Sequence, residues 1–220
     1  MGIITGYLCL LCFCFLLVKA LTRKLHFVKM DRIIMRIHKT VSAAFLIICI
    51  SHIIFVYPVL KTRHMFVPVT GILIAGVSVV MIVLCHMVKT KKRNLTIHRI
   101  LSLVMLCCVV GHIVIYFVDY KNYQTRIHEI QIGDVTISGI KDGRYTGAYD
   151  AGYIYAKVEV TVKDGQIADI NILKHDNERG TLAETITDEV IARQQVDVDA
   201  ISGATNSSMV IKKAIENALK

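Results

Sequence analysis

The sequence predicts a bundle of four membrane-spanning helices followed by a small α+β domain. Each of four apolar runs reaches the roughly 20 residues that a helix needs to cross a bilayer. Beyond residue 140 the runs give way to alternating apolar and polar residues, which is typical of strands. We therefore predict a membrane domain over 1–120, a linker over 121–140 and a second domain over 141–220. The predicted spans are 3–21, 40–60, 66–88 and 99–118.

The charges divide the chain at the same place. Residues 1–118 contain 14 lysines and arginines and one acidic residue, a net charge of +13, whereas residues 119–220 have a net charge of −4. The basic residues of the first part lie between apolar runs, so they follow membrane topology. We therefore expect membrane lipid as a partner and no nucleic acid.

The loops predict the orientation of the bundle. Six cations lie between residues 23 and 39 and five between 89 and 99, but the remaining connection has only Lys61 and Arg63. Loops rich in lysine and arginine stay cytoplasmic. We therefore expect a multi-pass membrane protein with its C-terminal domain extracytoplasmic. No cation precedes the first run, which favours a retained helix over a cleaved signal peptide.

The membrane part contains a repeat with a shift of 60 residues. Residues 26–53 and 86–113 share nine of 28 positions, including three histidines. We interpret this as a duplicated helical hairpin in which the second and fourth helices run parallel. His38 and His52 are then paralleled by His98 and His112, and the 14-residue spacing places the histidines of each helix on one face, roughly 21 Å apart.

Histidines inside a membrane are usually functional, and imidazole is an axial ligand of haem iron. This spacing and topology resemble the membrane cytochrome of ferric reductases and NADPH oxidases. The resemblance implies two b-type haems, with His38, His52, His98 and His112 as iron ligands. The alternative is that these histidines form hydrogen bonds between helices or snorkel to the interface. His26 and His86 are expected at the interface, where either could assist the cytoplasmic-side haem, and His64, His128 and His175 at the surface. All seven cysteines lie in apolar runs without zinc spacing, so no redox role is expected.

The C-terminal part reads as strands followed by helices. Residues 144–174 alternate, and Asp164-Gly165 is a strong hairpin turn. Helices are expected over 182–194 and 207–219, with a possible short strand near 130–132. Between a strand-like run at Val196 and Val198 and the last helix lies a loop of small and hydroxyl residues. Its glycine and the following helix N-terminus suit a phosphate, although Asn206 or Ser207 could simply cap the helix.

That loop carries a second resemblance. Ser202-Gly203-Ala204-Thr205 followed by x-Ser resembles the flavinylation motif of FMN-binding domains, which occur in flavin-carrying subunits of the sodium-pumping NADH:quinone reductase and of the related Rnf complex. The likeness covers about residues 141–220. It implies that a flavin transferase joins FMN to Thr205 through a phosphoester, and that Ser202, Gly203 and Ala204 belong to the flavin site.

A further loop, residues 175–182, resembles the second flavin-contacting loop of that family. Asn177 and Arg179 depart from its commoner residues, which leaves Gly180, Thr181 and Leu182 as the expected contacts. A helix start capped by Thr181 is the alternative.

Together these features predict an electron-transfer component of an oxidoreductase, with no catalytic residue of its own. Electrons would pass from a cytoplasmic or quinone donor through the haems to FMN and on to an extracytoplasmic acceptor. One alternative is a haem-free, membrane-anchored flavoprotein subunit of a larger redox complex. Another is a membrane-bound redox-sensing regulator, although the cytoplasmic loops are short for an output module.

Overall fold

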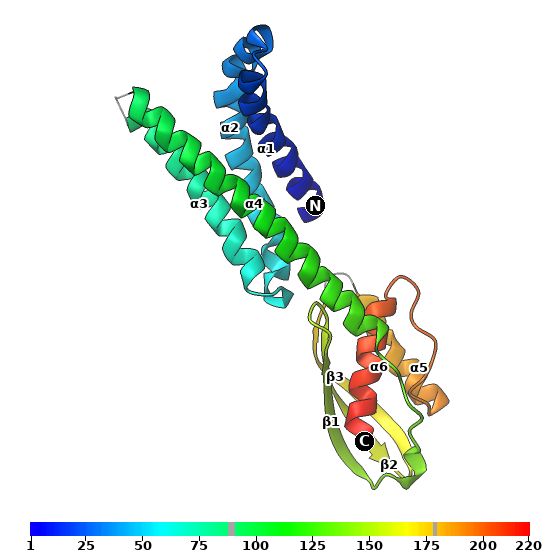
Figure 1. The fold of residues 1–220 in the computed structure, drawn as a ribbon. Helices are drawn as coiled ribbons and strands as arrows, with labels where there is room; N and C mark the ends of the chain where they lie inside the picture. The colour runs from blue at the N-terminus through cyan, green and yellow to red at the C-terminus, as the bar shows by residue number, and fades with distance from the viewer. Residues whose placement is uncertain (88–90, 178–179) are drawn as a thin grey trace. The chain divides into compact units, whose positions relative to one another are not determined.

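The computed structural model describes residues 1–87, 91–177 and 180–220 (Figure 1). Lys89, Glu178 and Arg179 lie outside the described residues, and so does the side chain of His86. The chain divides into two compact units. The membrane unit comprises residues 1–60 and 65–116, and the C-terminal unit comprises residues 61–64 and 117–220.

Four long helices make up the membrane unit, and all are long and apolar enough to span a bilayer, which confirms the prediction. The second helix begins at Val28, ahead of the predicted span 40–60, because the turn between the first two helices needs only residues 25–27, with His26 at a φ of 58°. A short 3-10 helix, η1 (Tyr57–Thr62), follows the second helix. The four helices are α1 (Gly2–Lys24), α2 (Val28–Val56), α3 (Phe66–Met87) and α4 (Lys91–His128).

The helices pair as two hairpins, α1 with α2 and α3 with α4 (Figure 1). One small apolar core joins them, and it takes side chains from all four helices. Many other large apolar side chains of these helices are exposed, which is the pattern expected where lipid surrounds a bundle. The buried core residues are Phe13, Phe45, Cys49, Ile74, Met105 and Val109.

The C-terminal unit is built on an antiparallel sheet of three strands in the order β1-β2-β3: β1 (Gly143–Asp150), β2 (Tyr155–Lys163) and β3 (Gln166–Asp176). Asp164 and Gly165 connect β2 to β3 with φ angles of 53° and 70°. Positive φ at both central positions is what a tight hairpin turn of this kind requires, and this is why Asp-Gly suits the position.

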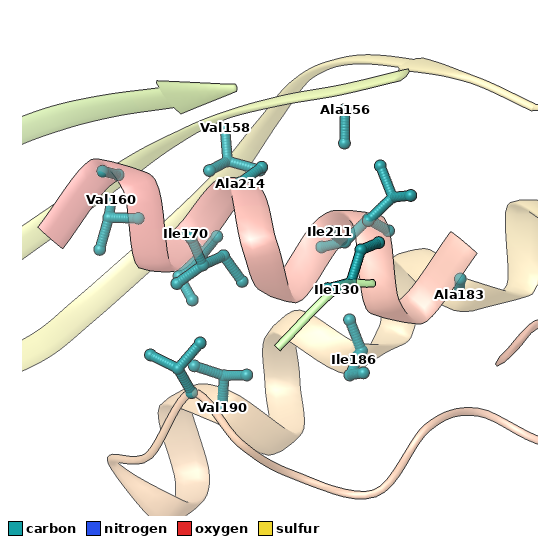
Figure 2. Packing of buried hydrophobic residues seen from close by; sticks show 14 of the residues in the cluster. Ile130, Ala156, Val158, Val160, Ile170, Ala183, Ile186, Val190, Ile211 and Ala214 are labelled. Carbon is teal, nitrogen blue, oxygen red and sulfur yellow. The ribbon is translucent and has the colours of Figure 1, made fainter. Parts of the chain in front are cut away.

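Helix α6 (Thr205–Leu219) packs on β1 and β2, and it forms the core together with η3 (Thr181–Thr185) and α5 (Ile186–Arg193). Figure 2 shows Val158 and Val160 of β2 beside Ile211 and Ala214 of α6. Alternate residues of β2 are fully buried, in agreement with the alternating sequence. Because β1 passes so close to α6, a Cβ built at Gly147 would lie 2.2 Å from the Ala214 carbonyl oxygen.

The segment expected to be a linker has a different structure. Helix α4 continues to His128, and Tyr123, Ile127 and Ile130 are buried in the core of the C-terminal unit. Residues 130–136 form no strand, contrary to the short strand considered near 130–132. Val196 and Val198 are also buried without belonging to a strand, so the predicted strand-like run before α6 was wrong.

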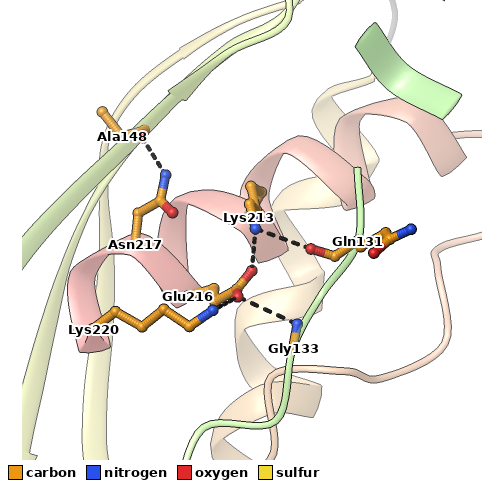
Figure 3. A network of polar contacts seen from close by, with 7 residues as sticks. All are labelled: Gln131, Gly133, Ala148, Lys213, Glu216, Asn217 and Lys220. Atoms are coloured by element: carbon orange, nitrogen blue, oxygen red, sulfur yellow. Dashed lines mark hydrogen bonds and ion pairs between the residues drawn. The ribbon is translucent and has the colours of Figure 1, made fainter. Parts of the chain in front are cut away.

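A buried carboxylate holds the segment after α4 against α6 (Figure 3). Glu216 is fully buried and accepts hydrogen bonds from the amide of Gly133 at 3.2 Å and from Lys213 Nζ at 2.7 Å. Lys220 pairs with the same carboxylate, and Lys213 Nζ also donates to the Gln131 carbonyl at 2.9 Å.

Candidate functional site

The Ser202–Thr205 loop is a tight turn fixed to α6. The Ala204 amide donates to the Ile201 carbonyl at 3.0 Å, and Gly203 has a φ of +78°. Such a turn needs positive φ at its third residue, which favours glycine. The buried Ser208 hydroxyl accepts from the Ile201 amide and donates to the Ala204 carbonyl, each at 3.1 Å. The turn therefore meets the helix in one defined geometry.

Thr205 is the first residue of α6, and its side chain is exposed. Ala204 occupies the N-cap position and supplies no side-chain cap. The alternative in which Asn206 or Ser207 caps the helix was therefore wrong, because both lie inside its first turn. The first amides of a helix have no partner within it and carry the positive end of the helix dipole. An anionic group attached to Thr205 would lie beside them.

The Asn206 side chain points to another element, since its Nδ2 donates to the Tyr123 hydroxyl at 2.9 Å. The rings of Tyr123 and Tyr153 are stacked with centroids 4.6 Å apart, and the Arg63 guanidinium lies 3.3 Å from the Tyr153 ring centroid. The end of α4 and the loop at residue 63 therefore hold the residue that follows Thr205. Sequence reasoning missed this contact, because nothing in the sequence pairs Tyr123 with Asn206.

Residues 175–182, the second loop expected to contact the flavin, approach the first turn of α6. A Cβ built at Gly180 would lie 2.0 Å from Ser207 Oγ, so only glycine allows this approach. The structure thus brings Gly180 next to the residues that follow Thr205. Thr181 and Leu182 begin η3 and are exposed, Leu182 to 68 %. No side-chain cap is formed at the start of η3, so the capping role considered for Thr181 was wrong.

A buried histidine contacts the loop that contains Gly180. The His175 side chain is only 2 % exposed, with Nδ1 2.9 Å from Glu184 Oε1 and 3.2 Å from Asn177 Nδ2. Asn177 Oδ1 in turn accepts from the Gly180 amide at 2.8 Å. The expectation that His175 has only a surface role was therefore wrong. The position of His175 at the end of β3 turns its ring inward, where it connects Glu184 to the loop.

In the membrane unit, His52 and His112 line one apolar cavity of about 90 Å³. The cavity lies among α1, α2, α3 and α4, and its other lining residues are apolar or small. An apolar lining with a few polar groups is the chemical character of a cofactor site, but the space is smaller than the roughly 300–1,000 Å³ of a typical ligand pocket, so a bound haem would have to displace lining side chains. The other lining residues are Gly6, Cys9, Leu10, Phe13, Phe45, Cys49, Ile53, Gly71, Ile74, Val109 and Ile113.

Both histidines are held by the helix that precedes their own. His52 Nδ1 lies 2.9 Å from the Gly2 carbonyl oxygen and 3.1 Å from Thr5 Oγ1. His112 Nδ1 lies 2.8 Å from Thr70 Oγ1. A glycine leaves room for each ring: a Cβ on Gly6 would be 3.2 Å from His52 Cε1, and the corresponding distance from Gly71 to His112 is 3.4 Å. We did not foresee these residues, although Thr-Gly occurs at the same place in both helices.

The second pair of histidines also meets. The ring centroids of His38 and His98 are 6.2 Å apart with an interplanar angle of 72°. His38 meets His98, and His52 and His112 line the same cavity, so α2 and α4 run parallel, as the repeat predicted. Two imidazoles at this separation could hold one metal ion between them. The described residues contain no group of three or more His, Cys, Asp or Glu side chains that could bind a metal ion.

Residues 152–220 match the family model of the FMN-binding domain. The comparisons with curated proteins and with solved structures returned no match. The matched residues comprise β2, β3, η3, α5 and α6, together with the turn that carries Thr205, whereas β1 precedes them. The chain is thus a multi-pass membrane protein with a C-terminal FMN-binding domain. FMN is a redox cofactor, so this domain suggests a flavoprotein that takes part in electron transfer.

Proposed function

We propose that this protein transfers electrons across a bacterial cell membrane, from a cytoplasmic or quinone donor to an extracytoplasmic acceptor or partner. Thr205 carries FMN through a phosphoester formed by a flavin transferase. His38 with His98 and His52 with His112 hold two b-type haems. When bound, both kinds of group supply reversible electron transfer. The chain positions them, separates them from water and adjusts their potentials.

The histidine cavity is the observation that carries the proposal. It is apolar, it is entered by one imidazole from each half of the repeat, and glycines face both rings. His52 and His112 also form hydrogen bonds to the preceding helix, which is the alternative role, and the cavity that they share is what favours a cofactor beyond that role. The separation of His38 and His98 supports a second haem at the other end of the bundle.

Attachment at Thr205 is supported by its exposure and by its place at the start of α6. A phosphoester there keeps a negative charge, which the free amides and dipole of the helix end stabilise. Gly180 and the turn at Gly203 bring backbone close to this point without side chains in the way.

The orientation is supported by loop charge. With four spans, the connection at residues 61–64 and the C-terminal domain lie on the same side of the membrane. This connection is poor in cations, whereas the opposite connections are rich in them. Protease added to intact cells should therefore cleave the C-terminal domain, and protection of that domain would refute the orientation.

The haem assignment is tested on protein purified from a host that makes haem b. We expect a reduced-minus-oxidised spectrum of b type and about two haems per chain by pyridine haemochrome. His52→Ala with His112→Ala should remove one haem, and His38→Ala with His98→Ala the other. A parent protein without haem would instead support the haem-free flavoprotein subunit.

The flavin assignment is tested by fluorescence of the denatured protein in a gel. The parent chain, matured with a flavin transferase, should fluoresce, and Thr205→Ala should not. Thr146→Ala is the matched control, because Thr146 is also exposed but lies on β1. Equal fluorescence of the parent and Thr205→Ala would refute attachment at this residue.

A further inference from the structure

The repeat extends to the first helix of each hairpin, with a shift of 65 residues in place of 60. Thr5-Gly6 of α1 corresponds to Thr70-Gly71 of α3, and Gly2 corresponds to Val67. In each half the three residues surround one histidine of the following helix. The backbone of Gly2 and Thr5 Oγ1 contact His52, and the backbone of Val67 and Thr70 Oγ1 contact His112.

The hydrogen-bond donors in these contacts can be identified. Thr5 Oγ1 donates to the Gly2 carbonyl at 2.8 Å, and Thr70 Oγ1 donates to the Phe66 carbonyl at 2.8 Å. Each hydroxyl hydrogen is therefore already used, so the oxygen is an acceptor toward the histidine. A carbonyl only accepts, and hence Nδ1 of His52 carries the hydrogen. The same assignment holds for His112, whose Nδ1 faces Thr70 Oγ1.

In a neutral imidazole with hydrogen on Nδ1, Nε2 keeps its lone pair. The contacts thus select one tautomer in both rings and leave the same nitrogen of each as the donor atom. Threonine in a helix often bonds to a carbonyl of its own helix, and both residues do so. This hydrogen bond within the helix does not explain why each Oγ1 also lies within 3.1 Å of Nδ1 of a histidine on the next helix. The contact recurs at the same place in both halves of the repeat.

We propose that Thr5 and Thr70 are positioning residues that, together with the backbone of Gly2 and Val67, fix the tautomer and ring orientation of His52 and His112 for binding the iron of one haem. The inference rests on the proposed function of these two histidines. A hydrogen bond from Nδ1 raises the basicity of a ligating imidazole. A more basic ligand stabilises ferric iron, so the two threonines keep the potential of this haem low. In the part of the chain that the structure describes, His38 Nδ1 has no hydrogen-bond partner, so this support is not shared by that ring.

The test compares Thr5→Val with Thr70→Val, singly and together, in the full-length protein. Valine keeps the shape of threonine and removes the acceptor. Thr5→Ser and Thr70→Ser keep the hydroxyl and should behave as the parent. Ser78→Ala is the matched control, because Ser78 is a buried residue of α3 whose hydroxyl bonds to its own helix, at Ile74.

Two quantities are measured: the rate of haem transfer to excess apomyoglobin and the midpoint potentials from a redox titration. Loss of such supporting contacts typically weakens metal binding about 10- to 100-fold, so we expect release of one haem to accelerate by a factor in this range. The potential of the same haem should rise, by up to about 59 mV for a tenfold change in its reduction equilibrium. The haem assigned to His38 and His98 is an internal reference and should not change.

The proposal is overturned if the valine variants match Ser78→Ala in both release rate and potential. It is also overturned if the serine variants are as impaired as the valine variants, because the hydroxyl would then not be the cause. Neither result resembles failure of the haem assignment itself, in which the parent protein would contain no haem.

Discussion

Replacing Glu216 by glutamine should loosen the C-terminal unit, because one buried carboxylate holds three partners there. Burial alone would raise the pKa of Glu216, but hydrogen bonds from Lys213, Lys220 and the Gly133 amide outweigh it and hold the pKa below its usual value. Glutamine keeps an acceptor oxygen but has no charge. Hydrogen bonds to charged groups contribute about 1.5–3 kcal/mol each. Both lysines can turn to water, since their side chains are 23 % and 56 % exposed.

We therefore expect Glu216→Gln to reduce the free energy of unfolding of the C-terminal unit by about 1.5–3 kcal/mol. At about 1.4 kcal/mol per factor of ten, exchange of the β2 amides should become about 10- to 150-fold faster. Hydrogen exchange of the full-length protein, followed by mass spectrometry, measures this. Glu189→Gln is the control, because Glu189 forms an exposed pair with Arg193, and such pairs contribute less than about 1 kcal/mol. Equal exchange in the two variants would refute the reasoning.

The same carboxylate predicts a pH dependence. Because its pKa is lowered in the folded protein, its contribution is complete above the unfolded-state pKa of about 4.3 and declines as the pH falls toward the folded value. After correction for intrinsic exchange rates, the parent protein should lose protection of β2 below about pH 4.3. Glu216→Gln should lack this part of the loss, and an identical acid profile would contradict the assignment.

Three glycine substitutions test other close approaches. Gly147→Ala should destabilise the C-terminal unit by about 1–3 kcal/mol or more, since the new Cβ would lie 2.2 Å from the Ala214 carbonyl oxygen. Hydrogen exchange measures this loss. Gly143→Ala is the control and should show no such effect, because its Cβ would meet only ordinary contacts at 3.5 Å. Gly180→Ala should reduce in-gel flavin fluorescence by displacing the loop from Ser207, and parent-level fluorescence would argue against a role of this loop. Gly6→Ala should accelerate haem release by pushing the His52 ring, whereas Gly76→Ala on α3, with no atom within 4 Å of its Cβ, should not.

Some features of the structure could be predicted from local sequence patterns, because they do not depend on contacts with distant residues. The four spans are set by the length of uninterrupted apolar sequence, and the β2–β3 hairpin by Asp164-Gly165 with alternating residues on both sides. The parallel course of α2 and α4 could be predicted from the repeated histidines, since equivalent halves of a repeat have the same direction. These signals lie within one element or recur at one spacing.

Other features depend on partners far apart in the chain. The stretch that continues α4 is polar and was expected to be a linker, but Tyr123 and Ile127, one helical turn apart, are buried in the C-terminal core. His175 was assigned to the surface, because its sequence neighbours do not reveal that Glu184 and Asn177 enclose it.

By itself, the sequence determined that this chain crosses a membrane four times and ends in an α+β domain with a flavinylation-like motif, because hydropathy, alternation and turn chemistry act over neighbouring residues. Only the tertiary structure decided that Thr5 and Thr70 meet His52 and His112 beside one cavity, and that Gly180 meets the turn after Thr205. The orientation of a side chain is selected by groups on other helices and strands. No pattern along a single segment contains that information.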